Sequence, residues 1–154
     1  MRHFGFLFLI LSVFSCGQVP EAEVENQENN GYFGNFPDSP FLNLTFNEEI
    51  DKQKALLIEK GFQFDEENHG IDQDEVEVFL GGDETLTSLK VLLFNQKQSD
   101  FESKIQFFAG KSSKNSKSDH FATFEFDGNG QQYSLTMFMF EDMIRLNFRL
   151  KSSH

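Results

Sequence analysis

Alternation of apolar and polar residues dominates the last third of the chain. Three runs alternate in this way, and they cover residues 121–126, 131–140 and 143–150. An Asp-Gly-Asn-Gly sequence at 127–130 and a Glu-Asp pair separate the runs as turn formers, so the pattern predicts an antiparallel meander. Strand side chains alternate between the two faces of a sheet. The last run therefore separates its apolar residues Ile144, Leu146, Phe148 and Leu150 from its polar residues Arg145, Asn147 and Arg149.

A helix is predicted after a short strand further upstream. Residues 41–46 alternate as a half-buried strand does. The helix that follows has two candidate N-caps, a capping box of Thr45 with Glu48 or a direct cap by Asn47, and Gly61 supplies its end. Its buried stripe is expected to contain Ile50 and Leu57, with Ala55 and Ile58 as further candidates.

The middle of the chain predicts three more strands and a second helix. Residues 62–68 and 74–80 read as a weaker strand pair around a Glu-Asn-His-Gly turn, and residues 86–95 read as a stronger strand. A short helix is predicted within residues 99–111. Its signals are a capping box of Ser99 with Glu102, apolar residues at helical spacing and a final glycine, namely Phe101, Ile105, Phe108 and Gly110.

These elements together predict an α+β fold. We expect an antiparallel sheet of about five to seven strands with one or two helices on one face and a C-terminal three-stranded meander. A chain of 154 residues has room for one domain.

The first residues have the pattern of an export signal. Arg2 precedes an apolar run from Phe4 to Phe14 that only Gly5 and Ser12 interrupt. A helix that spans a bilayer needs about 20 apolar residues, so this run is too short. Its length and its flanks fit the hydrophobic region of a signal peptide.

The end of this run, Val13-Phe14-Ser15-Cys16, resembles the lipobox of bacterial lipoproteins, in which a small residue precedes an invariant cysteine. The resemblance implies that Cys16 is alkylated by a diacylglycerol group, and that cleavage after Ser15 makes it the first residue of the mature protein. Phe14 departs from the commonest form of the motif, in which this position is small. Two alternatives are an ordinary secretory signal that is cut after Gly17 and an uncleaved anchor. Stable membrane binding needs more than one acyl chain, which lipoprotein processing often supplies.

Residues 17–30 follow as an acidic tether, with four Glu and neither Lys nor Arg. We expect disorder there, because this composition buries too little apolar surface to offset the entropy of folding. The continuation to Pro40 adds Tyr32, Phe33 and Phe36, which are candidates to dock on the folded body. An acidic segment after the cysteine also resembles the surface-exposed lipoproteins of Bacteroidota, which implies an outer-membrane location.

The chain therefore divides into three parts. We assign residues 1–15 to a signal peptide, residues 16–40 to the lipidated cysteine and a flexible tether, and residues 41–154 to a single α+β domain.

The formal net charge of −12 narrows the choice of partners. Binding to nucleic acid depends on Lys and Arg that displace counterions from phosphates, so no nucleic-acid partner is predicted. A single cysteine rules out an intramolecular disulfide and a zinc site built from cysteines. The predicted partners are the membrane, through the lipid on Cys16, and an unidentified protein.

No catalytic residue, metal site or cofactor is predicted. We expect His69 and His120 to be exposed loop histidines rather than zinc ligands. Asp127 and Asn129 are spaced like calcium ligands, but the rest of that loop template is missing, so a hairpin turn is favoured. A solvated loop is favoured over a weak cation site for the acidic residues Asp65, Glu66, Glu67, Asp72, Asp74, Glu75 and Glu77.

Two further features bear on binding. Lys111, Lys114 and Lys117 form the only basic island, which is either a contact for an acidic partner or a mobile connection. Phenylalanine occurs 21 times. Most of these rings are expected in the core, and an exposed patch of them would indicate a protein interface.

The function expected from these observations is that of a membrane-anchored envelope lipoprotein with a small, non-catalytic binding or structural domain. The alternative is an inhibitor or immunity-type protein that binds a toxin or a hydrolase.

Overall fold

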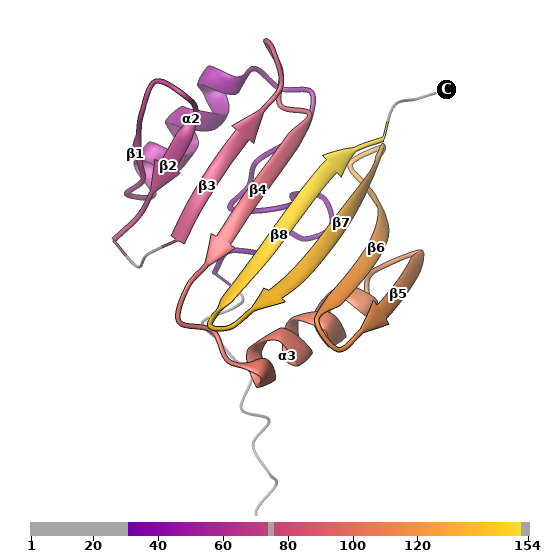
Figure 1. The fold of residues 1–154 in the computed structure, drawn as a ribbon. Helices are drawn as coiled ribbons and strands as arrows, with labels where there is room; N and C mark the ends of the chain where they lie inside the picture. Colours follow the sequence, from indigo (N-terminus) through magenta and orange to yellow (C-terminus); the bar gives the residue numbers. More distant parts are fainter. Residues whose placement is uncertain (1–30, 74–75, 152–154) are drawn as a thin grey trace, which may run out of the picture.

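An antiparallel sheet of eight strands organises the fold (Figure 1). The structure is a computed structural model of the chain, and it describes residues 31–73 and 76–151. The strand order is β1-β2-β3-β4-β8-β7-β6-β5, and every neighbouring pair is antiparallel. The described elements are, in chain order, α2 (Ile50–Glu59), β1 (Gln63–Phe64), β2 (His69–Ile71), β3 (Val76–Gly81), β4 (Ser88–Leu93), α3 (Gln98–Ala109), β5 (Lys114–Ser118), β6 (Phe121–Gly128), β7 (Gln131–Phe140) and β8 (Met143–Leu150).

The sequence prediction of an α+β fold is confirmed, and its strand count is too low. The C-terminal meander is confirmed as β6, β7 and β8. The weaker strand pair is divided differently, because β1 and β2 form a first hairpin and β3 then pairs with β2. The basic island contains a further strand, β5, whose residues are all exposed. Neither β2 nor β5 alternates apolar with polar residues, so the pattern that reveals buried strands misses them.

One face of the sheet is covered and forms the core. The alternating residues of the central strands that point to this face are buried, for example Val78, Val91 and Leu146 at 0% exposure. Side chains from both helices belong to the same apolar cluster, which includes Leu57 of α2 and Phe108 of α3. Both helices therefore contribute to covering one face.

Residues 31–47, which we call the strap, cover the centre of the same face and pass behind β4 and β8 in Figure 1. The strap is anchored by Phe33, Phe36 and Phe41, which are at most 5% exposed. The ring of Phe36 lies 4.6 Å from that of Phe126 and 5.0 Å from that of Phe108, centroid to centroid. Residues 31–40 of the predicted tether thus lie within the packed body.

The strand predicted for residues 41–46 is wrong. The segment consists of turns and irregular backbone, and Leu42 and Asn43 have φ values of 46° and 65°. Positive φ is incompatible with an extended strand. The turns nevertheless direct Phe41, Leu44 and Phe46 into the core, and Leu42 is partly buried.

Helix α2 is confirmed, but its predicted caps are not used. No side chain caps its N-terminus. The backbone N–H of Thr45 donates to Oε1 of the buried Gln53 over 2.8 Å, and Asn47 has a φ of 64°. Ile50 and Leu57 are buried as expected, whereas Ala55 and Ile58 are exposed.

Helix α3 is also confirmed, with its capping interaction two residues before the predicted one. Oδ2 of Asp100 accepts the backbone N–H of Lys97 over 2.7 Å, so Lys97 is the N-cap residue and Asp100 takes the part expected of Glu102. Gly110 follows the last helical residue, as predicted. The predicted stripe of Phe101, Ile105 and Phe108 is buried.

A candidate binding face on the sheet

The second face of the sheet, which we call the open face, has no described helix or loop over it (Figure 1). Its residues alternate with the core residues along each strand and are only partly buried. The strand register arranges them in rows that cross the sheet. The central row is His69, Phe79, Lys90, Asn147, Thr136 and Thr123.

Three phenylalanine rings form an aromatic patch on the open face. Phe121 and Phe138 are cross-strand partners with ring centroids 5.2 Å apart, and Phe140 follows along β7 at 5.9 Å from Phe138. Phe121 and Phe140 are 37% and 44% exposed. The Cζ atom of Arg145 lies 4.5 Å and 5.0 Å from the centroids of Phe138 and Phe140. The open face therefore carries an exposed patch of phenylalanine rings, a feature that the sequence left open.

A fourth phenylalanine ring on this face, that of Phe79, lies between two polar side chains. The imidazole of His69 stacks on it with centroids 4.2 Å apart, and Nζ of Lys90 lies 3.4 Å from its centroid. The nitrogens of His69 lie 3.3 Å from Oδ2 of Asp65 and 3.2 Å from Oε2 of Glu77. His69 is thus a half-buried strand residue held by two carboxylates, and the prediction of an exposed loop histidine is wrong for it.

Asp65 also receives backbone hydrogen bonds in this hairpin. Its Oδ1 accepts the N–H groups of His69 at 3.1 Å and Glu67 at 2.8 Å. The hydrogen bond from the His69 backbone is the main cause that lowers the pKa of Asp65. The carboxylate therefore closes the turn between β1 and β2.

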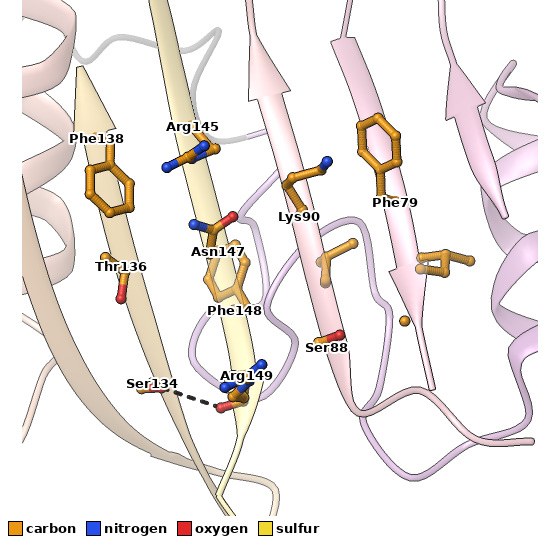
Figure 2. A pocket seen from close by; sticks show the side chains of 13 residues that line it. Phe79, Ser88, Lys90, Ser134, Thr136, Phe138, Arg145, Asn147, Phe148 and Arg149 are labelled. Carbon is orange, nitrogen blue, oxygen red and sulfur yellow. Dashed lines mark hydrogen bonds between the residues drawn. The ribbon is translucent and has the colours of Figure 1, made fainter. Parts of the chain in front are cut away.

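Between Phe79 and Phe138 the open face contains a hollow of about 550 Å³ (Figure 2). Figure 2 shows Lys90, Asn147 and Arg145 side by side on β4 and β8, and Arg149 lies further along β8. The residues that line the hollow include these three cations and no Asp or Glu. The complete chain has 25 acidic and 13 basic residues, so the hollow reverses the charge balance of the protein.

The carboxylates that flank the hollow on the open face are already engaged. Glu77 bonds to His69, as described above. Glu125, opposite Ser134, has its Oε2 atom 2.9 Å from Nζ of Lys151. The hydrogen bond from Lys151 lowers the pKa of Glu125, so this carboxylate is charged at neutral pH and paired outside the hollow.

The structure separates the three lysines that the sequence groups as a basic island. Lys114 pairs with Glu125 in the register and so lies on the open face. Lys117 pairs with the buried Ala122 and lies on the side of α3, where it lines a hollow with Gln98. Nζ of Lys111 lies 5.3 Å from the ring of Phe107. Residues 114–118 are thus strand β5 rather than a connection, and Lys114 and Lys117 lie on opposite sides of this strand.

The other candidate residues are placed as follows. His120 lies in the exposed turn between β5 and β6, as expected. Asn129 and Gly130 have φ values of 51° and 72° and form the hairpin turn between β6 and β7, which confirms that prediction. A Cβ atom on Gly128 would lie 2.1 Å from the carbonyl oxygen of Pro37, so the strap requires glycine there.

One acidic residue of the loop before β3, Asp72, helps to hold the strap and the strand. Asp72 accepts a hydrogen bond from the hydroxyl of Tyr32 at Oδ2 and one from the N–H of Val76 at Oδ1.

Among the described residues, no group of three His, Cys, Asp or Glu side chains is placed to hold a metal ion. Asp74 and Glu75 lie outside the described residues.

The predicted signal peptide, Cys16 and the first part of the tether also lie outside the described residues. Within residues 31–73 and 76–151, neither helix is long and apolar enough to cross a bilayer.

Sequence reasoning missed the cationic hollow, although part of its signal is visible in the sequence. The alternation of the last run places Arg145, Asn147 and Arg149 on one side of a strand. Their neighbour Lys90 comes from a strand far away in the sequence, and its position depends on the pairing of β4 with β8. That pairing brings the cations together.

Comparisons with known proteins add no relative: no family model, no curated protein and no solved structure matches this chain.

Proposed function

We propose that this protein is a lipid-anchored protein of the bacterial cell envelope whose folded domain binds a partner protein on its open face and catalyses no reaction. The observation that carries this proposal is the open face itself, where an aromatic patch and a cationic hollow lie side by side. Aromatic residues and arginine are enriched at protein interfaces, and they supply most of the binding energy there.

The residues of the open face favour binding over catalysis. Arg145 stacks on the rings of Phe138 and Phe140, and Lys90 lies over Phe79. These contacts hold two long side chains in place before a partner arrives, which reduces the entropy that binding costs. His69 has carboxylates at both ring nitrogens, which suits a structural ion-pair cluster.

The anchor is tested by changing the cysteine. The Cys16→Ala variant is expected to lose incorporation of labelled fatty acid and to leave the membrane fraction, because only the acyl chains oppose the repulsion between an acidic protein and an anionic surface. A Ser15→Ala variant keeps a small residue before the cysteine and serves as the control. Retention of Cys16→Ala in the membrane fraction would reject the lipid anchor.

The binding face is tested by site-specific photocrosslinking in the cells that make the protein. A photoreactive residue at Thr136, in the centre of the open face, is expected to give a discrete protein adduct. The same residue at Gln106, exposed on α3, is the control and is expected to give none. The pair Phe121→Ser and Phe140→Ser should weaken the adduct while the protein stays folded, since both rings are partly exposed. Equal adducts from both positions would contradict the proposal.

An inhibitor or immunity-type role is the second candidate, and it makes use of a different surface. Strand β5 is an edge strand whose residues are all exposed, so its outer backbone groups are available for pairing with another chain. The identity of the crosslinked partner distinguishes the two roles, because this one requires a toxin or a hydrolase. Adducts from β5 instead of Thr136 would favour it.

A further inference from the structure

We infer that the partner inserts an acidic, extended segment into the hollow, with carboxylates at alternate positions. This inference rests on the proposed function and names the chemistry that the open face recognises. It is carried by the arrangement of three cations around Asn147, in a hollow that has no carboxylate in its lining.

The strand register fixes this arrangement. Lys90 of β4 is the cross-strand partner of Asn147, so Arg145 and Arg149 are its two diagonal neighbours. Diagonal neighbours in an antiparallel sheet are about 7–8 Å apart. Lys90 therefore forms one corner of a triangle whose other corners lie along β8, with the amide of Asn147 in the middle.

The spacing of these cations matches that of an extended peptide. Alternate residues of an extended chain lie on the same side and are about 7 Å apart. A segment that runs along β8 places its first acidic side chain near Arg145, its second near Lys90 and its third near Arg149. Adjacent acidic residues point to opposite sides, so a block of them fits less well.

The local electrostatics favour carboxylates. Nε of Arg145 is buried and meets no hydrogen-bond acceptor within residues 31–73 and 76–151. A guanidinium that is already partly desolvated gives up less hydration when a carboxylate binds it. Asn147 and Thr136 add neutral hydrogen-bond donors between the cations.

The charge of the whole chain sets the size of the segment. A long polyanion would be repelled by the remaining surface of a protein with a net charge of −12. A short segment contacts the cations of the hollow directly. Salt screens its repulsion from acidic groups of the protein that lie more than about 10 Å away. The fitting occupant is thus an acidic segment of a protein, and it is only a few residues long.

The test uses two labelled peptides of the same composition, Glu-Ser-Glu-Ser-Glu and Glu-Glu-Glu-Ser-Ser. Fluorescence anisotropy with the full chain in a nonionic detergent is expected to show binding of the alternating peptide at least about fivefold tighter than that of the block peptide. Raising the salt from about 0.05 M to about 0.5 M should weaken this binding. Equal affinity of the two peptides overturns the inference.

Variants locate the binding site. Lys90→Gln and Arg149→Gln are each expected to weaken the alternating peptide by about fivefold to tenfold, because each removes one charged contact. Lys117→Gln changes the net charge equally but lies on the side of α3, and its effect should stay within about twofold. Circular dichroism confirms that each variant is folded. An effect of Lys117→Gln as large as that of the other two overturns the inference.

Two outcomes separate this inference from the proposed function. If Thr136 gives an adduct in cells but neither peptide binds, the open face remains the binding face and the acidic partner is rejected. If the alternating peptide binds but Thr136 gives no adduct in cells, the hollow still recognises acidic segments and the proposed role in cells is rejected. If the peptide binds only after Glu21, Glu23 and Glu25 are changed to Gln, the chain's own tether is the occupant and the inference is overturned.

Discussion

Two buried hydroxyl groups show how the cost of burial depends on a single partner. The hydroxyl of Tyr133 donates to the carbonyl oxygen of Pro37 over 2.6 Å, and burial raises the pKa of this phenol. Oγ of Ser39 is also buried but meets no hydrogen-bond partner among the described residues. The first hydroxyl joins the strap to the centre of the sheet, whereas the second is desolvated without compensation.

Tyr133→Phe is therefore expected to destabilise the protein. The change leaves the carbonyl of Pro37 without its donor and should lower the free energy of unfolding by about 1–2 kcal/mol. Urea denaturation followed by circular dichroism measures the change. Ser39→Ala is the control, and its stability should equal or exceed that of the wild type. A larger loss for Ser39→Ala than for Tyr133→Phe would contradict this account.

Lys104 is a buried cation on α3, only 4% exposed. Burial lowers its pKa, and its Nζ donates to Oε1 of Gln96 over 3.3 Å. Because the folded state disfavours the charged form, the cost is fully present below the folded pKa. It falls as the pH rises through the folded pKa toward the unfolded value.

Lys104→Met is accordingly expected to stabilise the protein at neutral pH, by about 1 kcal/mol. The advantage over the wild type should shrink as the pH approaches about 10, where the unfolded lysine also loses its proton. Thermal unfolding of both proteins across this pH range provides the measurement. A constant or growing difference at alkaline pH would show that the charge of Lys104 is not the cause.

At the scale of elements, the periodic patterns predicted the strands and helices that have a buried apolar face. The predicted capping signals misplaced the N-terminal caps of the helices. The strands β4, β6, β7 and β8 and both helices follow from alternation or helical spacing, because their buried faces are apolar. Residues 41–46 of the strap were predicted as a strand because their apolar and polar residues alternate, but turns bury Phe41, Leu44 and Phe46 there. Strand β5 was missed because a polar edge strand has no buried face to reveal it. The cationic hollow depends on long-range pairing, which a single sequence does not encode locally.

The cap of α3 gives a test of this distinction. Asp100→Ala removes the acceptor for the N–H of Lys97 and should cost about 1 kcal/mol. Ser99→Ala changes the residue that the sequence pattern favoured as the cap, and it should leave the free energy of unfolding unchanged within about 0.5 kcal/mol. Chemical denaturation of the two variants decides between the two caps. The reverse order would restore the cap predicted from sequence.

At the scale of the whole molecule, the sheet consists of two halves that meet along a single pairing. Strands β1 to β4 form one half and β5 to β8 form the other, and only β4 with β8 joins them. The last of the described strands, β8, is therefore a central strand. It has a strand partner on both sides, β4 and β7.

A chain that ends after Asp142 is expected to lack a cooperative unfolding transition, because both neighbours of β8 lose their partner. A chain that ends after Lys151 keeps every described strand and should unfold cooperatively near the wild-type temperature. Calorimetry and limited proteolysis compare the two. A cooperative transition in the shorter chain would show that the halves fold independently.

The central position of β8 also has a consequence for secretion. If the chain is exported from its N-terminus, as we propose, β8 is the last of the described strands to enter the translocation channel, and it is the strand that unites the two halves. The two halves of the sheet cannot pair with each other in the cytoplasm while β8 is still being synthesised. This delay favours passage of the unfolded chain through the membrane.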